Sequence, residues 1–145
     1  MVQIEKNLNL YLSNLNVLYA KLHNLHWYVS GEGFFTTHAK LEELYNITAE
    51  GIDEVAEVML STGLKPFASL SKYLENASIK ELEAKNVKSK EAIEVVLADF
   101  KEMRELAKSI LEEAEDSKQY AVVDLFSGYV AEYDKTLWML NAFLA

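Results

Sequence analysis

The sequence predicts an all-α fold: a four-helix bundle with one long crossover connection that carries a short extra helix. Its 145 residues include one proline and five glycines, so few positions interrupt a long helix. Apolar residues recur at helical spacing in four separate segments. The connections between these segments are short, long and short in chain order, and this pattern restricts the topology.

The first two helices are predicted on either side of a glycine-containing loop. Their apolar positions are mostly three or four residues apart, which places each set on one helix face. Gly31 and Gly33 separate the two helices, and the second ends near Gly63. The first stripe comprises Ile4, Leu8, Tyr11, Leu15, Leu18, Leu22 and Leu25, and the second comprises Leu41, Tyr45, Thr48, Ile52, Val55 and Met59.

Two further helices are predicted in the second half of the chain, joined by a short polar turn. We expect Ser89 to be the N-cap of the third helix, and Asp116 or Ser117 that of the fourth. Between helices two and three, the stretch SLSKYLENA predicts a short extra helix. The stripes comprise Ile93, Leu97, Phe100, Ala107, Ile110, Leu111 and Ala114, then Val122, Leu125, Tyr129, Tyr133, Leu137 and Leu140.

The lengths of the connections predict how the helices are arranged. Short connections make helices one and two, and helices three and four, antiparallel pairs. The connector of roughly residues 61–88 must run the length of the bundle. One long crossover is the ferritin-like arrangement, and we expect residues 1–145 to form a single domain of this kind. The alternative is an ordinary bundle with an unstructured middle loop, although structureless loops of this length are uncommon.

The composition excludes several classes of protein. The net charge of −9 argues against a nucleic-acid backbone as the main partner and is compatible with attracting cations, although solubility alone also explains it. The absence of cysteine excludes disulfides and thiolate metal sites. No apolar run approaches the ~20 residues that a membrane-spanning helix needs, and the first residues lack a secretory-signal pattern. We therefore expect a cytoplasmic protein with no membrane partner.

The candidate metal ligands are two histidines and two carboxylates. The Glu-x-x-His signature of a di-iron site within one bundle is absent, because the residues three before each histidine are alanine, histidine and phenylalanine. His26 and His38 lie on either side of the glycine turn, whereas Asp53 and Glu57 lie one turn apart on the second helix. Two imidazoles and two carboxylates suit a first-row metal such as Fe(II).

Helix geometry prevents one chain from assembling these four ligands. His38 and Asp53 are separated by ~22 Å along one helix, whereas metal–ligand bonds are about 2 Å long. We therefore predict that two chains share the site across a two-fold axis. Ordinary roles also stay open for these four residues: the histidines as core or surface residues, and the two carboxylates as part of a solvated helix face. Glu42 is either a hydrogen-bond partner of the His38 ring or a solvent-exposed residue, and we expect that His23 is not a ligand.

The chain resembles the mini-ferritins known as the Dps family, the DNA-binding proteins from starved cells. The resemblance spans nearly the whole chain. It is carried by KLHNLHWYVSGEGFFTTHAKLEELY, IDEVAE, LSTGLKPFASLSKYLENASI and DKTLWMLNAFL. It implies a dodecamer built from two-fold dimers, with a di-iron centre at each shared site. It also implies that the protein oxidises Fe(II), preferentially with hydrogen peroxide, and stores ferric mineral inside the shell, which protects the cell from oxidative damage.

The resemblance also assigns roles to single residues. His26 and His38 are expected to bind iron from one subunit, and Asp53 and Glu57 from its partner. Trp27 is expected to donate an electron to a stray oxidant. Trp138 is either a second such residue or a packing residue. The acidic residues expected in the pores through which iron enters are Glu115, Asp116 and Asp124.

The chain departs from the family in two respects. Val58 stands where many members have an arginine, which leaves the electrostatics at the interface or pore open. Neither end carries the lysine-rich tail that members use to bind DNA, so DNA binding is not expected. Two other hypotheses remain: a DNA-compacting protein with little ferroxidase activity, and a structural assembly with a vestigial metal site.

Overall fold

The computed structural model describes residues 2–145, which form five helices and two very short strands. In chain order these are α1 (Gln3–Tyr28), β1 (Val29–Ser30), α2 (Phe34–Ser61), α3 (Leu70–Asn76), β2 (Val87–Lys88), α4 (Ser89–Asp116) and α5 (Tyr120–Leu144). The predicted four long helices, long crossover and short extra helix are confirmed. Among residues 2–145, no helix is both long enough and apolar enough to span a membrane.

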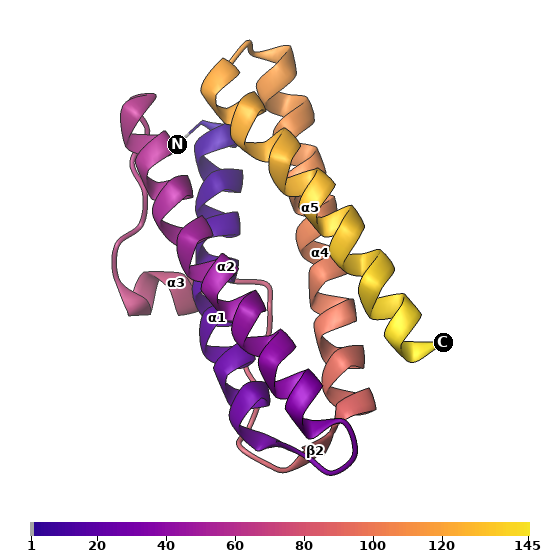
Figure 1. Cartoon of the computed structure of the whole chain (residues 1–145). Helices are drawn as coiled ribbons and strands as arrows, with labels where there is room; N and C mark the ends of the chain where they lie inside the picture. The colour runs from indigo at the N-terminus through magenta and orange to yellow at the C-terminus, as the bar shows by residue number, and fades with distance from the viewer. Residues whose placement is uncertain (1) are drawn as a thin grey trace.

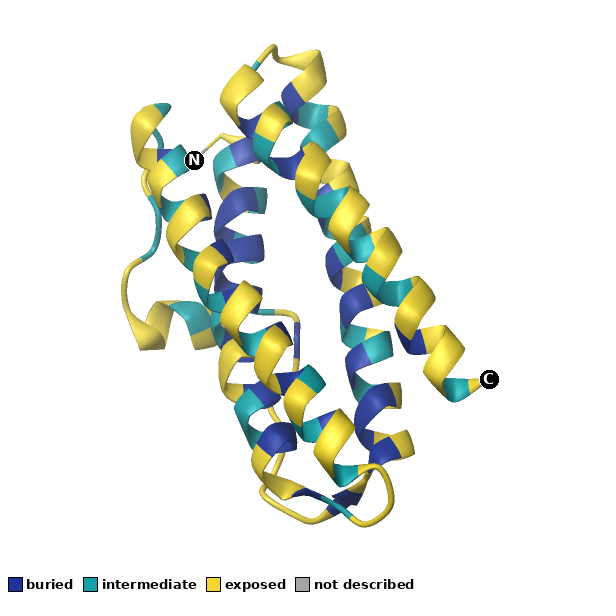
Figure 2. Ribbon diagram, in the orientation of Figure 1, coloured by how far each residue is buried: buried dark blue, intermediate teal, exposed yellow. Residues whose placement is uncertain are grey.

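The bundle consists of two antiparallel helix pairs. Helix α1 packs along α2, and α4 packs along α5 (Figure 1). Helices α1 and α4 join the two pairs, and their buried residues face one another (Figure 2). The fully buried residues Leu8, Leu12, Leu18 and Leu22 of α1, with Met103 and Ile110 of α4, belong to this core.

Buried asparagines of α1 hold the crossover connector against the bundle. The Asn9 side chain accepts a hydrogen bond from the Phe67 amide (2.8 Å) and donates one to the Lys65 carbonyl (3.1 Å). The side-chain oxygen of Asn14 (Oδ1) accepts hydrogen bonds from the backbone amides of Ser78 (2.8 Å) and Ile79 (3.1 Å). These bonds satisfy polar groups that burial would otherwise leave unpaired, so the connector follows a defined path.

Helix α3 begins where the sequence provides a capping residue. Ser69 has an extended backbone, and its hydroxyl accepts a hydrogen bond from the Lys72 amide (3.4 Å). The helix then packs against α1. The predicted extra helix is therefore a docked part of the fold, and the alternative of an unstructured middle loop is wrong.

The predicted N-caps of the last two helices are wrong. Lys88 is the N-cap of α4, and Ser89 is its first helical residue. The Ser89 hydroxyl instead donates to the Glu32 carbonyl (2.9 Å), because the loop between α1 and α2 folds against the start of α4. Asp116 ends α4, and Ser117 is its C-cap.

The N-cap of α5 is Gln119. The turn before it contains Lys118 with a positive φ of 59°. The turn between α4 and α5 therefore extends to Gln119, beyond the predicted caps Asp116 and Ser117.

Candidate metal centre

The two strands fix the loop that separates the candidate histidines. Val29 and Ser30 pair in parallel with Val87 and Lys88, so the loop after α1 is attached to the end of the crossover connector. Gly33 then adopts a left-handed backbone (φ 78°) as the N-cap of α2, a conformation that favours glycine. This loop turns the chain back, and the last turn of α1 lies beside the first turns of α2.

His26 and His38 hold each other through a pair of crossed hydrogen bonds. Nδ1 of His26 lies 2.7 Å from the His38 carbonyl oxygen, and Nδ1 of His38 lies 2.8 Å from the His26 carbonyl oxygen. A carbonyl oxygen only accepts, so each Nδ1 carries the proton and donates. The two rings stack with centroids 3.6 Å apart and planes 13° apart.

The crossed bonds determine which nitrogen is available for a metal. With Nδ1 protonated, a neutral imidazole presents the lone pair of Nε2. A hydrogen bond from the opposite ring nitrogen to a carbonyl is how metal-binding histidines are normally oriented. The arrangement therefore suits His26 and His38 as a pair of Nε2 ligands.

Glu42 lies beside the His26 ring, whereas the sequence had suggested the His38 ring as its hydrogen-bond partner. Its Oε1 is 3.9 Å from Nε2 of His26, while Nδ1 of His38 donates to the His26 backbone. Glu42 therefore does not hold the His38 ring through Nδ1. Its side chain remains half exposed, with a carboxylate on the side of His26 where a metal would bind.

His23 has a different environment. Its ring stacks on Tyr45 with centroids 3.8 Å apart, and its Nδ1 donates to the Tyr19 carbonyl (2.8 Å). Trp27 packs beside it, with a centroid distance of 5.3 Å, yet is 66% exposed. A large, exposed indole next to His26 is the kind of side chain that protein interfaces cover.

The two candidate carboxylates lie further along α2. Asp53 and Glu57 are both exposed and one turn apart. Within residues 2–145 no three His, Cys, Asp or Glu side chains are grouped closely enough to hold a metal ion. One chain thus presents a histidine pair and a carboxylate pair at separate places on the same helix pair.

The three predicted pore residues are exposed, at or near the turn between α4 and α5. Glu115 and Asp116 end α4, and Asp124 lies in the second turn of α5. Asp124 also lines a cavity between the two helix pairs. Their pore role stays a prediction.

A comparison with protein-family models matches residues 5–145 to the ferritin-like domain. A starvation protein of Bacillus anthracis, named DNA protection during starvation protein 2, is 42% identical over 142 residues, covering 98% of this chain and 97% of that protein. The chain belongs to the Dps family of ferritin-like proteins.

Solved Dps structures share the fold over the full length. The crystal structure of a Dps protein from Bacillus brevis matches with a TM-score of 0.92 and 38% identity, covering 100% of this chain and 99% of that one. A structure of Listeria innocua Dps soaked with zinc matches with a TM-score of 0.91 and 35% identity, covering 98% and 96% of the two chains. The predicted family and fold are therefore confirmed.

The sequence did not reveal what orients the histidines. Both acceptors are backbone carbonyls, which no residue pattern specifies. A cluster of Tyr11, Tyr129, Tyr133 and Glu54 was also missed, because the tyrosines look like ordinary members of apolar stripes. The sequence did contain one signal for this cluster. Three positions of the apolar stripes carry tyrosine, with a hydroxyl group, although phenylalanine would fill the same space.

Proposed function

We propose that this Dps-family chain is a subunit of an iron-oxidising mini-ferritin, with Fe(II) as its substrate. The observation that supports this most is the crossed hydrogen bonding of His26 and His38, which leaves both Nε2 atoms for metal binding. Two exposed carboxylates of α2, Asp53 and Glu57, complete a ligand set of nitrogen and oxygen donors that suits first-row metals.

The proposed site is shared between two subunits. The histidines of one subunit and the carboxylates of its partner would meet across a two-fold axis, which gives two equal sites per dimer. The exposed Trp27 beside His26 supports an interface here. The proposal includes a di-iron centre at each site and a dodecameric shell that stores the ferric product.

The proposed reaction uses peroxide as a two-electron oxidant. Two Fe(II) ions give up one electron each, and hydrogen peroxide takes up both with two protons to become two water molecules. Asp53 and Glu57 would stabilise the additional positive charge of Fe(III). Trp27 would donate one electron to an oxidant that escapes this two-electron reaction. The protein thereby removes both reactants that generate hydroxyl radical.

DNA binding is not part of the proposal, although relatives carry the name DNA protection. The net charge of −9 per chain would make an assembly of these subunits repel a phosphate backbone. We expect no shift of a DNA fragment in a gel at low salt. Tight binding there would favour the DNA-compacting alternative.

The deciding experiment adds Fe(II) anaerobically and then hydrogen peroxide, with air as the comparison. Ferric absorbance and residual peroxide are followed together. We expect rapid oxidation with peroxide consumed and slow oxidation in air. The variant His26→Ala should oxidise iron no faster than protein-free buffer.

His23→Ala is the matched control, because it removes a histidine one turn away. Its rate should stay close to that of the unmodified protein. Equal rates for His26→Ala and the unmodified protein would contradict the proposed site.

A further inference from the structure

The second helix of each pair forms one wall of a groove. Within residues 2–145, α2 and α5 do not pack closely along one another, although α1 and α4 join the two pairs behind them. The space between α2 and α5 is a cavity of about 480 Å³, which we call the α2–α5 groove. Its volume lies within the ~300–1,000 Å³ range of binding sites for small organic molecules.

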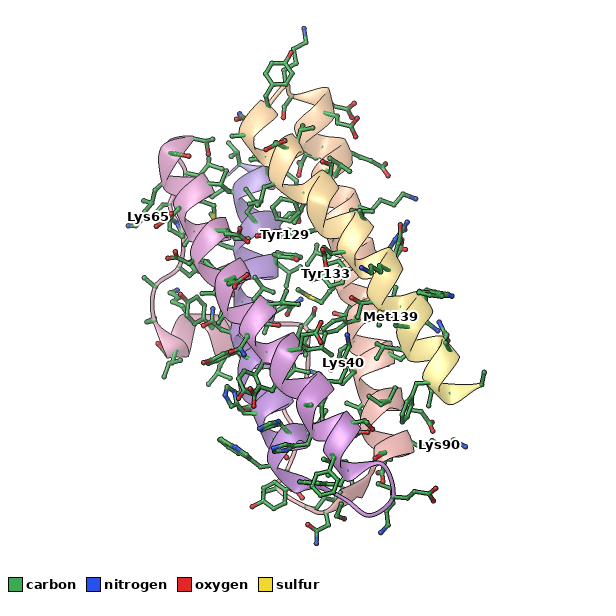
Figure 3. All side chains as sticks on the ribbon, in the orientation of Figure 1. Lys40, Lys65, Lys90, Tyr129, Tyr133 and Met139 are labelled. Carbon is green, nitrogen blue, oxygen red and sulfur yellow. The ribbon has the colours of Figure 1, made fainter. Side chains whose placement is uncertain are left out.

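The floor of the α2–α5 groove is aromatic and aliphatic. Its base comprises Tyr11, Leu15 and Leu18 of α1 and Phe100 of α4. Figure 3 shows Tyr129 and Tyr133 on α5, directed toward α1 and α2. The Tyr133 hydroxyl shares a hydrogen bond with that of Tyr11 (2.7 Å). Tyr129 donates one to Oε1 of Glu54 (2.9 Å), so these hydroxyl groups have partners and the floor presents mainly ring and methyl surface to a ligand.

Two glycines widen the groove from opposite walls. Gly51 of α2 and Gly128 of α5 both line it, in the interior of long helices, where glycine costs about 1 kcal/mol relative to alanine. A Cβ added at Gly128 would meet no neighbouring atom within 4 Å. The groove is therefore open space beside the backbone of α5.

Carboxylates form the rim of the groove. They belong to Glu50 and Glu54 on α2 and to Asp124 and Glu132 on α5, and the described residues that line the groove include no lysine, arginine or histidine. Within residues 2–145, no ion pair reaches Glu50, Asp124 or Glu132. The rim therefore attracts positive charge that the chain itself does not supply.

Two lysines bound the groove on the side of the C-terminus of α5. Lys40 and Lys135 line a second, smaller hollow, which Glu132 shares with the groove. Lys40 is paired with Glu43 (3.3 Å). Because like charges repel, these lysines confine a positively charged ligand to the part of the groove that extends from Glu132 toward Asp124.

Helix geometry gives the spacing of the rim charges. Asp124 and Glu132 are eight residues apart on α5, which corresponds to ~12 Å along the helix axis. Glu54 lies between them along the groove, because it accepts the hydrogen bond of Tyr129. A ligand that matches this rim has positive charges at both ends of a long, narrow molecule and an apolar chain between them.

We propose that the α2–α5 groove binds a linear aliphatic polyamine, with its ammonium groups at the rim carboxylates and its methylene chain on the floor. Ammonium groups form charge-assisted hydrogen bonds with carboxylates and are also attracted to aromatic rings. A bare metal cation would leave the apolar floor in water, and an uncharged molecule would leave the carboxylates without a partner. The four proposed iron ligands do not line the groove, so this binding is separate from the proposed function.

The test measures binding to the assembled, metal-free protein. Radiolabelled spermidine is equilibrated with the protein by dialysis at about 0.15 M salt, where attraction between distant charges is screened. We expect saturable binding that approaches one spermidine per subunit. Mg²⁺, which carries charge without a chain, and putrescine, which is too short to span the rim, should compete weakly. Displacement by Mg²⁺ as effective as by unlabelled spermidine would overturn the proposal.

Two variants and a control locate the site. Gly128→Leu places a side chain in the open space and should abolish saturable binding, while leucine favours the helix more than glycine does. Glu132→Gln removes one rim charge and should weaken binding severalfold. Glu94→Gln is the control, because Glu94 is an exposed carboxylate of α4 that does not line the groove, and it should leave the affinity unchanged.

Size-exclusion chromatography first establishes that each variant assembles like the unmodified protein. Unchanged binding in assembled Gly128→Leu would overturn the proposal. Equal affinities of Glu132→Gln and Glu94→Gln would also overturn it, and this comparison decides the matter if Gly128→Leu does not assemble.

Discussion

The His26 ring donates a hydrogen bond to the His38 carbonyl oxygen at 2.7 Å, and the His38 ring donates one to the His26 carbonyl oxygen at 2.8 Å. Each imidazole is thus positioned by the backbone of the other residue. The last turn of α1 and the start of α2 therefore form one unit, held together by two acceptors that belong to the backbone.

The first prediction concerns the tautomers of these histidines. In the metal-free protein both His26 and His38 should carry the proton on Nδ1, because their partners are carbonyl oxygens. Nitrogen-15 chemical shifts of the neutral imidazole rings measure this directly. A proton on Nε2 of either ring would contradict the proposed ligand geometry.

The second prediction tests whether subunits share the site. A subunit with His26→Ala and His38→Ala is co-assembled with one carrying Asp53→Asn and Glu57→Gln. Each parent should be inactive in iron oxidation, whereas a random equal mixture should regain about a quarter of the sites through mixed dimers.

Two controls are built into this complementation experiment. The parents are mixed after assembly, when no subunit exchange is expected, and activity should then stay absent. If co-assembled shells also remain inactive while the unmodified protein oxidises iron, the site is not divided as proposed.

The third prediction concerns the attachment of the crossover connector. Asn14→Ala leaves the amides of Ser78 and Ile79 without their acceptor and should lower the free energy of unfolding by about 2 kcal/mol. Urea unfolding gives the loss, and hydrogen exchange at those two amides should accelerate.

Asn141→Ala provides the comparison for this change. Asn141 is exposed and its side chain donates only within its own helix, to the Leu137 carbonyl. Its effect should be within about 0.5 kcal/mol. If the two variants lose equal stability, the hydrogen bonds of Asn14 do not hold the connector.

The fourth prediction concerns alkaline stability. Burial raises the pKa of Tyr11 and of Tyr133 in the folded protein, whereas the unfolded chain ionises tyrosine near pH 10. The stabilisation of the folded state by these two neutral phenols is therefore fully present below about pH 10. It is lost as the pH rises through their raised, folded-state pKa values.

Urea unfolding at increasing pH should show this loss. Tyr133→Phe removes one of the two groups and should make the decline above about pH 10 shallower. The exposed Tyr120 offers the control Tyr120→Phe, which should leave the slope close to that of the unmodified protein. A slope unaffected by Tyr133→Phe would contradict this explanation.

Much of the candidate site was predictable because its spacing is a property of the chain. The separation of His38 from Asp53 along one helix is the reason for the prediction that two subunits share the site. The N-caps at Ser89 and Asp116 or Ser117 were mispredicted, because cap preference is local and Ser89 is used instead to bind the Glu32 carbonyl. The roles of the ligand and pore residues stay predictions.

The sequence by itself determined the helices, their antiparallel pairing and the long crossover, because apolar periodicity and connection length act along the chain. Only the tertiary structure decided the crossed bonding of His26 and His38, the attachment of the connector to Asn9 and Asn14, and the meeting of Tyr11 with Tyr133. These contacts join residues far apart in the sequence, or involve backbone carbonyls and amides that every residue carries. No pattern of side chains specifies such partners until the helices are packed.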